Sequence, residues 1–226
     1  MPGEAPLSTA FLRAERHLIE RLRTPSAVQR FLNQLPYNTE PAPGRATLRS
    51  FRGVVRHGTA HCLEAALAAA VILEQHGYPP LVLSFESIDE LDHVLFAYRR
   101  NGGWGSVARS RDPGLHGRKP VFPSARALAL SYVDPYVDFH GRITGYVVAD
   151  LRELMGEYDW RLSERNVWKV ERALLDLRHR PIRSSDRRID ALRVRYRAYR
   201  AKYGRKPVEY YRGREKWSEL PVEFRY

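Results

Sequence analysis

TAHCLEAALAAAVIL, residues 59–73, is the stretch that decides the fold of this chain. Its spacing predicts a helix over 60–76, with Thr59 as the N-cap and Gly77 directly after the last turn. The helix is apolar on nearly every side, which is typical of a helix buried at the centre of a domain. Cys62 would therefore lie in the first turn of a buried helix.

A meander of β-strands is expected after this helix, and Asn101-Gly102-Gly103 supplies the turn chemistry of a hairpin. One buried helix followed by antiparallel strands indicates the α+β class. In order, we expect strands over 81–85, 93–98 and 104–109, a Gly/Pro-rich loop over 111–123, a short helix over 124–132 and a strand over 143–148.

Helices are expected on both sides of this core. An amphipathic pattern predicts one over 8–23, and Thr24-Pro25 reads as an N-cap with proline at the first helical position of a second helix that ends at Leu35. Ser163 and Ser185 are the expected N-caps of two later helices. The chain is thus divided into an N-terminal helical segment (1–48), a core (49–150) and a helical C-terminal extension (151–226).

Composition limits the class of protein. The 226 residues are 43% hydrophobic and 28% charged, a globular balance. No stretch approaches the roughly 18 consecutive apolar residues of a membrane-spanning helix, and the N-terminus lacks the basic and apolar regions of a secretory signal, so a cytoplasmic protein is expected. A single cysteine excludes an internal disulfide and a multi-thiolate metal site.

The charge is strongly basic, at a formal net +12. Residues 150–226 hold 21 basic and 13 acidic residues, which indicates affinity for an anionic partner near the C-terminus. Two interpretations stay open for the last helix: a basic stacking surface for nucleic acid, or a tyrosine seam packed against the domain. The seam would comprise Ile189, Leu192, Tyr196, Tyr199 and Tyr203; the basic set is Arg187, Arg188, Arg193, Arg195, Arg197, Arg200, Lys202, Arg205 and Lys206.

Cys62 is the candidate nucleophile. Free N–H groups and the helix dipole at a helix N-terminus favour a thiolate, and the same N–H groups can stabilise an oxyanion. His93 opens a strand on which Leu95 and Ala97 would share its inward face, toward the buried helix, so it is the candidate base. Asp112, on the extension of the next strand, is the candidate acid that orients the imidazole.

These residues carry a resemblance to a known family. The run His57–Ala65, then Gly77-Tyr78-Pro79-Pro80, Asp92-His93-Val94, Gly103-Trp104 and Asp112-Pro113, resembles the core of the transglutaminase-like superfamily, in a bacterial branch of it. The resemblance implies a papain-like fold over about Arg49 to Val148 and a Cys-His-Asp triad.

By position, the triad would be Cys62, His93 and Asp112. The acid of the family usually falls near Ala108 of this chain, so Asp112 comes four residues late. Ser106, Ser110 or Asn101 could replace it, or the site could be a dyad.

The surroundings of Cys62 suggest how a substrate would bind. Trp104 is expected to wall the site, and His61 to flank it. Arg109, Arg111 and His116 form a basic loop that could receive a carboxylate or phosphate of the substrate or could pair with nearby acids. A zinc site of His57, His61, Cys62 and His93 does not match a familiar ligand spacing, so no metal or cofactor is expected.

The predicted function is acyl transfer by a thiol nucleophile, as an amide hydrolase, a peptidase-like enzyme or a transamidase. The substrate would be a peptide or a small amide or ester, and no membrane partner is expected. Two alternatives stay open: an inactive binding module of the same fold, and a basic nucleic-acid-binding protein.

Overall fold

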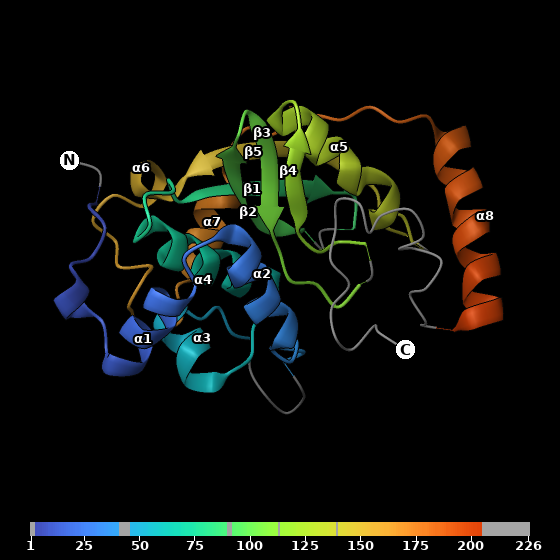
Figure 1. Ribbon diagram of the computed structural model, residues 1–226. Helices are drawn as coiled ribbons and strands as arrows, with labels where there is room; N and C mark the ends of the chain where they lie inside the picture. The colour runs from blue at the N-terminus through green and yellow to red at the C-terminus, as the bar shows by residue number, and fades with distance from the viewer. Residues whose placement is uncertain (1–2, 41–45, 90–91, 113, 139, 205–226) are drawn as a thin grey trace.

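The computed structural model describes residues 3–40, 46–89, 92–112, 114–138 and 140–204 (Figure 1). Its helices are η1 (Ser8–Ala10), α1 (Arg13–Arg21), α2 (Pro25–Gln34), α3 (Phe51–His57), α4 (Cys62–Glu74), α5 (Ala125–Tyr136), α6 (Leu151–Met155), α7 (Trp168–Leu175) and α8 (Asp186–Tyr203). Its strands are β1 (Leu81–Ser87), β2 (Val94–Arg100), β3 (Gly103–Val107), β4 (Arg118–Phe122), β5 (Ile143–Asp150) and β6 (Arg180–Pro181).

The six strands form one antiparallel sheet in the order β4-β3-β2-β1-β5-β6, so the α+β class is confirmed. Helix α4 packs on one face of the sheet with α1–α3 outside it, and α5 covers the other face (Figure 1). Helix α8 stands at the end of the molecule opposite α6. Within the described part of the chain, no helix has both the length and the apolarity to cross a bilayer.

Two apolar clusters hold the layers together. Every residue of α4 from Leu63 to Leu73 other than Glu64 belongs to the cluster on its side of the sheet, which confirms the central buried helix. Residues as distant as Phe11 and Leu174 belong to the same cluster. The three sequence segments therefore share one core, and their division into separate units stays a prediction.

Strand β2 corrects one expectation about its two faces. Val94, Phe96 and Tyr98 contribute to the α4 side, whereas Leu95 and Ala97 contribute to the α5 side. The alternation of a strand was predicted correctly, but it was assigned to the wrong faces. A period of two fixes which residues share a face and does not say which helix covers that face.

Local capping signals were predicted correctly at two helices. Thr24 and Ser185 accept hydrogen bonds from the backbone N–H three residues later, in α2 and α8. Ser124 caps α5 in the same way, at the start of the short helix expected over 124–132. The Asn101-Gly102 turn joins β2 to β3, and both residues have the positive φ that such turns require, 50° and 79°.

Helix α4 begins at Cys62 with His61 as its N-cap, so the prediction of Thr59 was wrong. Ala60 is held in a parallel bridge to Tyr37, which keeps the chain extended up to His61. The Thr59 hydroxyl instead accepts a hydrogen bond from Arg49 at 2.7 Å.

Two other local predictions were wrong. Strand β4 lies within the loop predicted over 111–123, and it contains Pro120; because β4 is an edge strand, it tolerates a residue without a backbone N–H. Ser163 caps no helix, since α7 starts at Trp168 after Val167.

Candidate functional site

The thiol of Cys62 lies at the first residue of α4, partly exposed, and the side chains of His61 and His93 both hydrogen-bond to it. Burial alone would raise the pKa of the thiol, but these hydrogen bonds and the charge of the two rings lower it to about 5. Cys62 would then be a thiolate at neutral pH, as a nucleophile requires. The structure thus brings together the predicted pair Cys62 and His93.

His93 comes just before β2 and is 3% exposed. Its ring is parallel to Phe85, 6.3 Å away, and Nε2 lies 2.9 Å from the carbonyl oxygen of Leu115. A carbonyl accepts hydrogen bonds only, so Nε2 carries a proton and the other ring nitrogen is left for Cys62. A backbone carbonyl therefore occupies the place that the sequence assigned to a carboxylate.

Asp112 lies away from this pair. Its side chain is 57% exposed and its carboxylate lies 3.5 Å from Nε of Arg111, whose side chain is 61% exposed. Among the described residues, no hydrogen bond or ion pair joins Asp112 to His93. The structure therefore does not place Asp112 as the group that orients the imidazole.

His61, which was expected only to flank the site, contacts the Cys62 thiol directly. Its side chain is 17% exposed, and Nε2 lies 2.9 Å from the carbonyl oxygen of Thr47 and 3.7 Å from the carboxylate of Glu64. Burial would lower the pKa of His61, but the hydrogen bond to Cys62 and the negative charges of Cys62 and Glu64 raise it to about 9.

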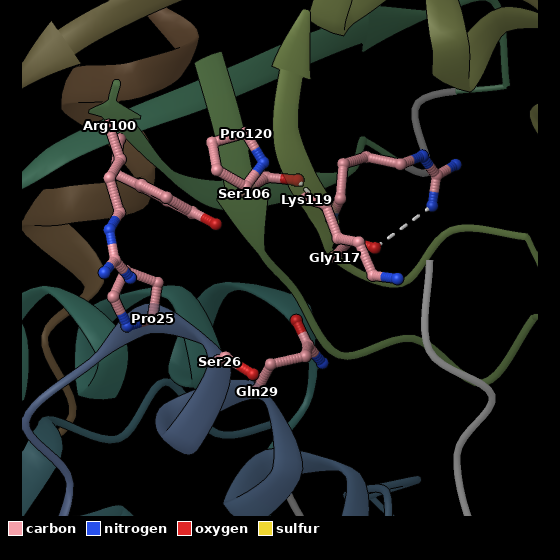
Figure 2. A pocket seen from close by; sticks show the side chains of 10 residues that line it. Pro25, Ser26, Gln29, Arg100, Ser106, Gly117, Lys119 and Pro120 are labelled. Atoms are coloured by element: carbon pink, nitrogen blue, oxygen red, sulfur yellow. Dashed lines mark hydrogen bonds between the residues drawn. The ribbon is translucent and has the colours of Figure 1, made fainter. Parts of the chain in front are cut away.

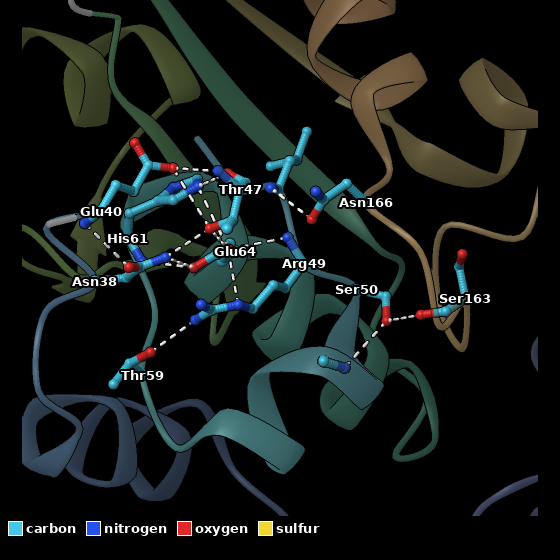
Figure 3. Close-up of polar contacts among 12 residues, drawn as sticks. Asn38, Glu40, Thr47, Arg49, Ser50, Thr59, His61, Glu64, Ser163 and Asn166 are labelled. Carbon is cyan, nitrogen blue, oxygen red and sulfur yellow. Dashed lines mark hydrogen bonds and ion pairs between the residues drawn. The ribbon is translucent and has the colours of Figure 1, made fainter. Parts of the chain in front are cut away.

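Glu64 is a fully buried carboxylate that the sequence analysis missed (Figure 3). It accepts hydrogen bonds from the backbone N–H groups of His61 and Arg49 and from the side chains of Asn38 and Thr47, at 2.9–3.1 Å. The hydrogen bond from the backbone N–H of His61, the N-cap, to Glu64 is half of a capping box. A glutamate three residues after an N-cap was therefore the sequence signal that could have identified Glu64.

Tyr37 is a second residue that the sequence analysis missed. The backbone N–H of Cys62 donates to its hydroxyl, and burial and the charge on Cys62 raise the pKa of Tyr37 well above its usual value. The guanidinium of Arg109 lies over the tyrosine ring, 5.7 Å from its centroid. A protonated hydroxyl thus lies beside the N–H that was expected to hold an oxyanion.

Two residues of the predicted basic loop are buried. Arg109 is 2% exposed, and its guanidinium donates to the carbonyl oxygens of Leu35 and Ser110. His116 is fully buried, and burial with the charges of Arg109, Arg118 and His93 lowers its pKa well below the usual value. Both side chains support the loop that carries Leu115, rather than lying open to receive a substrate.

Trp104 is also remote from the thiol. Trp104 pairs with Arg99 near the turn of the β2–β3 hairpin. Arg99 comes six residues after His93, and a strand rises about 3.3 Å per residue, so Trp104 lies about 20 Å from His93 along the strand direction. The structure therefore does not place Trp104 as a wall of the site.

A pocket lies on another part of the molecule, between α2 and strands β2, β3 and β4 (Figure 2). Its polar lining is already used: Gln29 bonds to both the N–H and the carbonyl of Ala108, and Ser106 bonds to Tyr132 and to the N–H of Arg118. None of its lining residues is a predicted site residue, so the chemistry at Cys62 is the stronger indication of function.

No group of three or more His, Cys, Asp or Glu side chains could hold a metal ion within the ranges that the structure describes.

On α8, Ile189 and Tyr199 are buried and the other seam residues are half-buried. Neither Ile189 nor Tyr199 belongs to one of the two apolar clusters, so packing of the seam against the domain stays a prediction. Arg188 pairs with Asp134 at 2.6 Å, whereas Arg205 and Lys206 lie outside the described residues. Nucleic-acid binding by α8 stays a prediction.

Comparisons with known proteins give little beyond the fold class. No family model matches the chain, and no curated protein matches it. Solved structures of Legionella pneumophila LapG align at 17% identity and a TM-score of 0.32 over 44% of this chain and 66% of theirs, just under two thirds of LapG. The EGTA-treated and calcium-bound forms of LapG align at 15% and 14% identity and TM-scores of 0.36 and 0.35, over 67% and 73% of this chain and 90% and 94% of theirs. At these scores the likeness does not establish a shared family, and the transglutaminase-like assignment stays a prediction of the motif.

Proposed function

We propose that this protein is a thiol-dependent acyl-transfer enzyme, a hydrolase of amides or esters or a transamidase, with Cys62 as its nucleophile. The observation that carries the proposal is a thiol at a helix N-terminus in contact with two imidazoles, with its pKa lowered to about 5. A buried structural cysteine has no need of such partners, whereas a nucleophile does.

The reaction follows from the contacts. The Cys62 proton passes to an imidazole, for which His93 is the predicted base, and the thiolate forms a bond to the carbonyl carbon. The carbonyl π electrons move to oxygen, and the N–H of Cys62 with the hydroxyl of Tyr37 can donate to that oxyanion. The leaving amine or alcohol takes the stored proton as its bond to carbon breaks, and water or an amine then releases the acyl group.

An activated ester such as p-nitrophenyl acetate tests the proposal without knowledge of the substrate. We expect the native protein to release nitrophenol and to show one acetyl adduct by intact-mass measurement. If this adduct is a thioester, it must lie on Cys62, because the chain has a single cysteine. Replacing Cys62 with Ala should abolish both signals while circular dichroism stays unchanged, and His93→Asn should slow steady-state turnover of the ester by about 10²–10⁴-fold. Acyl turnover that persists in Cys62→Ala would overturn the proposal.

A further inference from the structure

Cys62 has two histidines in contact, whereas the mechanism above needs only one. The two imidazoles are held alike, because Nε2 of His61 lies 2.9 Å from the carbonyl of Thr47 and Nε2 of His93 lies 2.9 Å from the carbonyl of Leu115. In each ring Nε2 therefore carries a proton, and the remaining nitrogen can take the proton of the thiol.

The charges around the two rings differ. His61 has the Glu64 carboxylate 3.7 Å from its Nε2, and Glu64 is fully buried, where a negative charge is only weakly screened. The nearest other charge on that side is Arg49, whose Nε lies 3.9 Å from Glu64. A proton on His61 is thus stabilised on both sides, by the thiolate and by the carboxylate.

His93 lies in different surroundings. Its ring lies beside those of Phe85 and Tyr132, at centroid distances of 6.3 and 6.0 Å. The guanidinium of Arg109 lies 3.4 Å from Nε2 of His116. Among the described residues no carboxylate forms an ion pair with His93, so it lacks the counterion that Glu64 provides to His61.

We propose that His61 is a second catalytic histidine, which stores the Cys62 proton as an imidazolium, that Glu64 is its positioning residue, and that His93 serves the attacking water in deacylation. This inference rests on the proposed function and assigns the two proton-transfer roles within it. It also explains why a carboxylate is buried directly behind the N-cap of the catalytic helix.

The proton inventory balances with this division of roles. His61 takes the thiol proton before attack and gives it to the leaving group when the carbon–nitrogen or carbon–oxygen bond breaks. His93 then takes a proton from the attacking water, at the ring nitrogen that does not contact Leu115, as the water oxygen bonds to the acyl carbon. When the carbon–sulfur bond breaks, sulfur leaves as thiolate and the acid loses its proton to become a carboxylate. Two protons of the water are then available, one on His93 and one from the acid. One of them returns His61 to its charged form and the other is released to solvent.

The test measures alkylation of Cys62 by iodoacetamide against pH, which needs no acyl substrate. Asn is a favoured N-cap residue, so His61→Asn keeps the start of α4 while it removes the imidazole. We expect the rate at pH 6 to fall at least tenfold in His61→Asn, because a rise of about two units in the thiol pKa, from about 5, reduces the thiolate population at that pH about tenfold. His57→Asn, on an exposed histidine of α3, is the matched control and should leave the rate unchanged.

The variant His93→Asn separates the two histidines: it should reduce alkylation at pH 6 less than His61→Asn does, while it loses deacylation. An NMR titration of the native protein adds a measurement that needs no variant. The His61 ring should stay charged at pH 7 and become neutral after alkylation removes the thiolate. A loss of alkylation in His93→Asn but not in His61→Asn, or a neutral His61 in the native protein, would overturn the inference.

Failure of the inference and failure of the proposed function give different results. If His61→Asn loses alkylation but the native protein forms no acyl adduct, the ion pair exists and acyl transfer does not. If acyl transfer occurs and His61→Asn alkylates normally, the enzyme stands and His93 alone stores the proton.

Discussion

At the scale of single residues, Cys62 meets groups from separate parts of the chain. His61 comes from the same helix start, His93 from the position directly before β2, and Tyr37 from the segment after α2. Their convergence gives the thiol a pKa of about 5, whereas a free cysteine titrates near 8.5. Such a shift in a partly exposed thiol is characteristic of a functional cysteine rather than of a packing residue.

The role of Asp112 yields a prediction at this scale. Because its carboxylate is 57% exposed and pairs with Arg111, Asp112→Asn should change the rate of acylation by less than about threefold. A triad acid, by contrast, typically contributes several orders of magnitude to kcat. Steady-state kinetics with an activated ester measures the difference, and a loss of 100-fold or more would restore Asp112 to the triad.

At the scale of elements, the site depends on how the loop after β3 is held. The side chain of Gln29, on α2, accepts from the N–H of Ala108 and donates to its carbonyl, both at 2.9 Å. Beyond this clamp, the chain carries Leu115, whose carbonyl orients His93. Helix α2 therefore supports the position of a catalytic imidazole that it does not touch.

Replacing Gln29 with Leu should destabilise the protein by about 2–4 kcal/mol, because it leaves a buried N–H and a buried carbonyl without partners. Urea unfolding measures the free energy of unfolding. Gln34→Leu, on an exposed position of the same helix, is the control and should change stability by less than about 0.5 kcal/mol. Equal effects of the two variants would show that the clamp contributes nothing.

At the scale of the whole molecule, a buried ion pair connects the central helix to the segment after α6. The guanidinium of Arg161 donates to both carboxylate oxygens of Glu74, each at 2.8 Å, and their side chains are 6% and 4% exposed. Arg161 also donates to the carbonyl of Gly3 and lies over the ring of Trp160. This contact joins three segments that the sequence assigned to separate units.

Arg161→Met should lower the free energy of unfolding by about 3–5 kcal/mol, since it leaves the Glu74 carboxylate buried without its partner. Because the segments share one core, we expect the native protein to unfold in a single thermal transition, and the midpoint of that whole transition to fall in Arg161→Met. Arg165→Met, at an exposed site four residues on, should leave the transition unchanged. Two transitions, only one of which moves in Arg161→Met, would support the division at residue 151.

The sequence by itself determined the local features of this protein. The apolar run of α4 predicted a buried helix, short-range capping signals located the starts of α2 and α8, and Asn101-Gly102 predicted the hairpin. Cys62 and His93 were found because a helix start and a strand start are recognisable from neighbouring residues. Each of these features depends on interactions within a few residues along the chain.

The tertiary structure alone decided how the site is completed. Leu115 orients His93 through a backbone carbonyl, which no side-chain pattern can indicate, and Tyr37 reaches Cys62 through a bridge between distant segments. Glu64 looks like one polar residue in an apolar helix until Asn38 and Thr47 are packed around it. Partners that are distant in sequence are selected by packing and by the need to satisfy buried polar groups, and local periodicity contains neither.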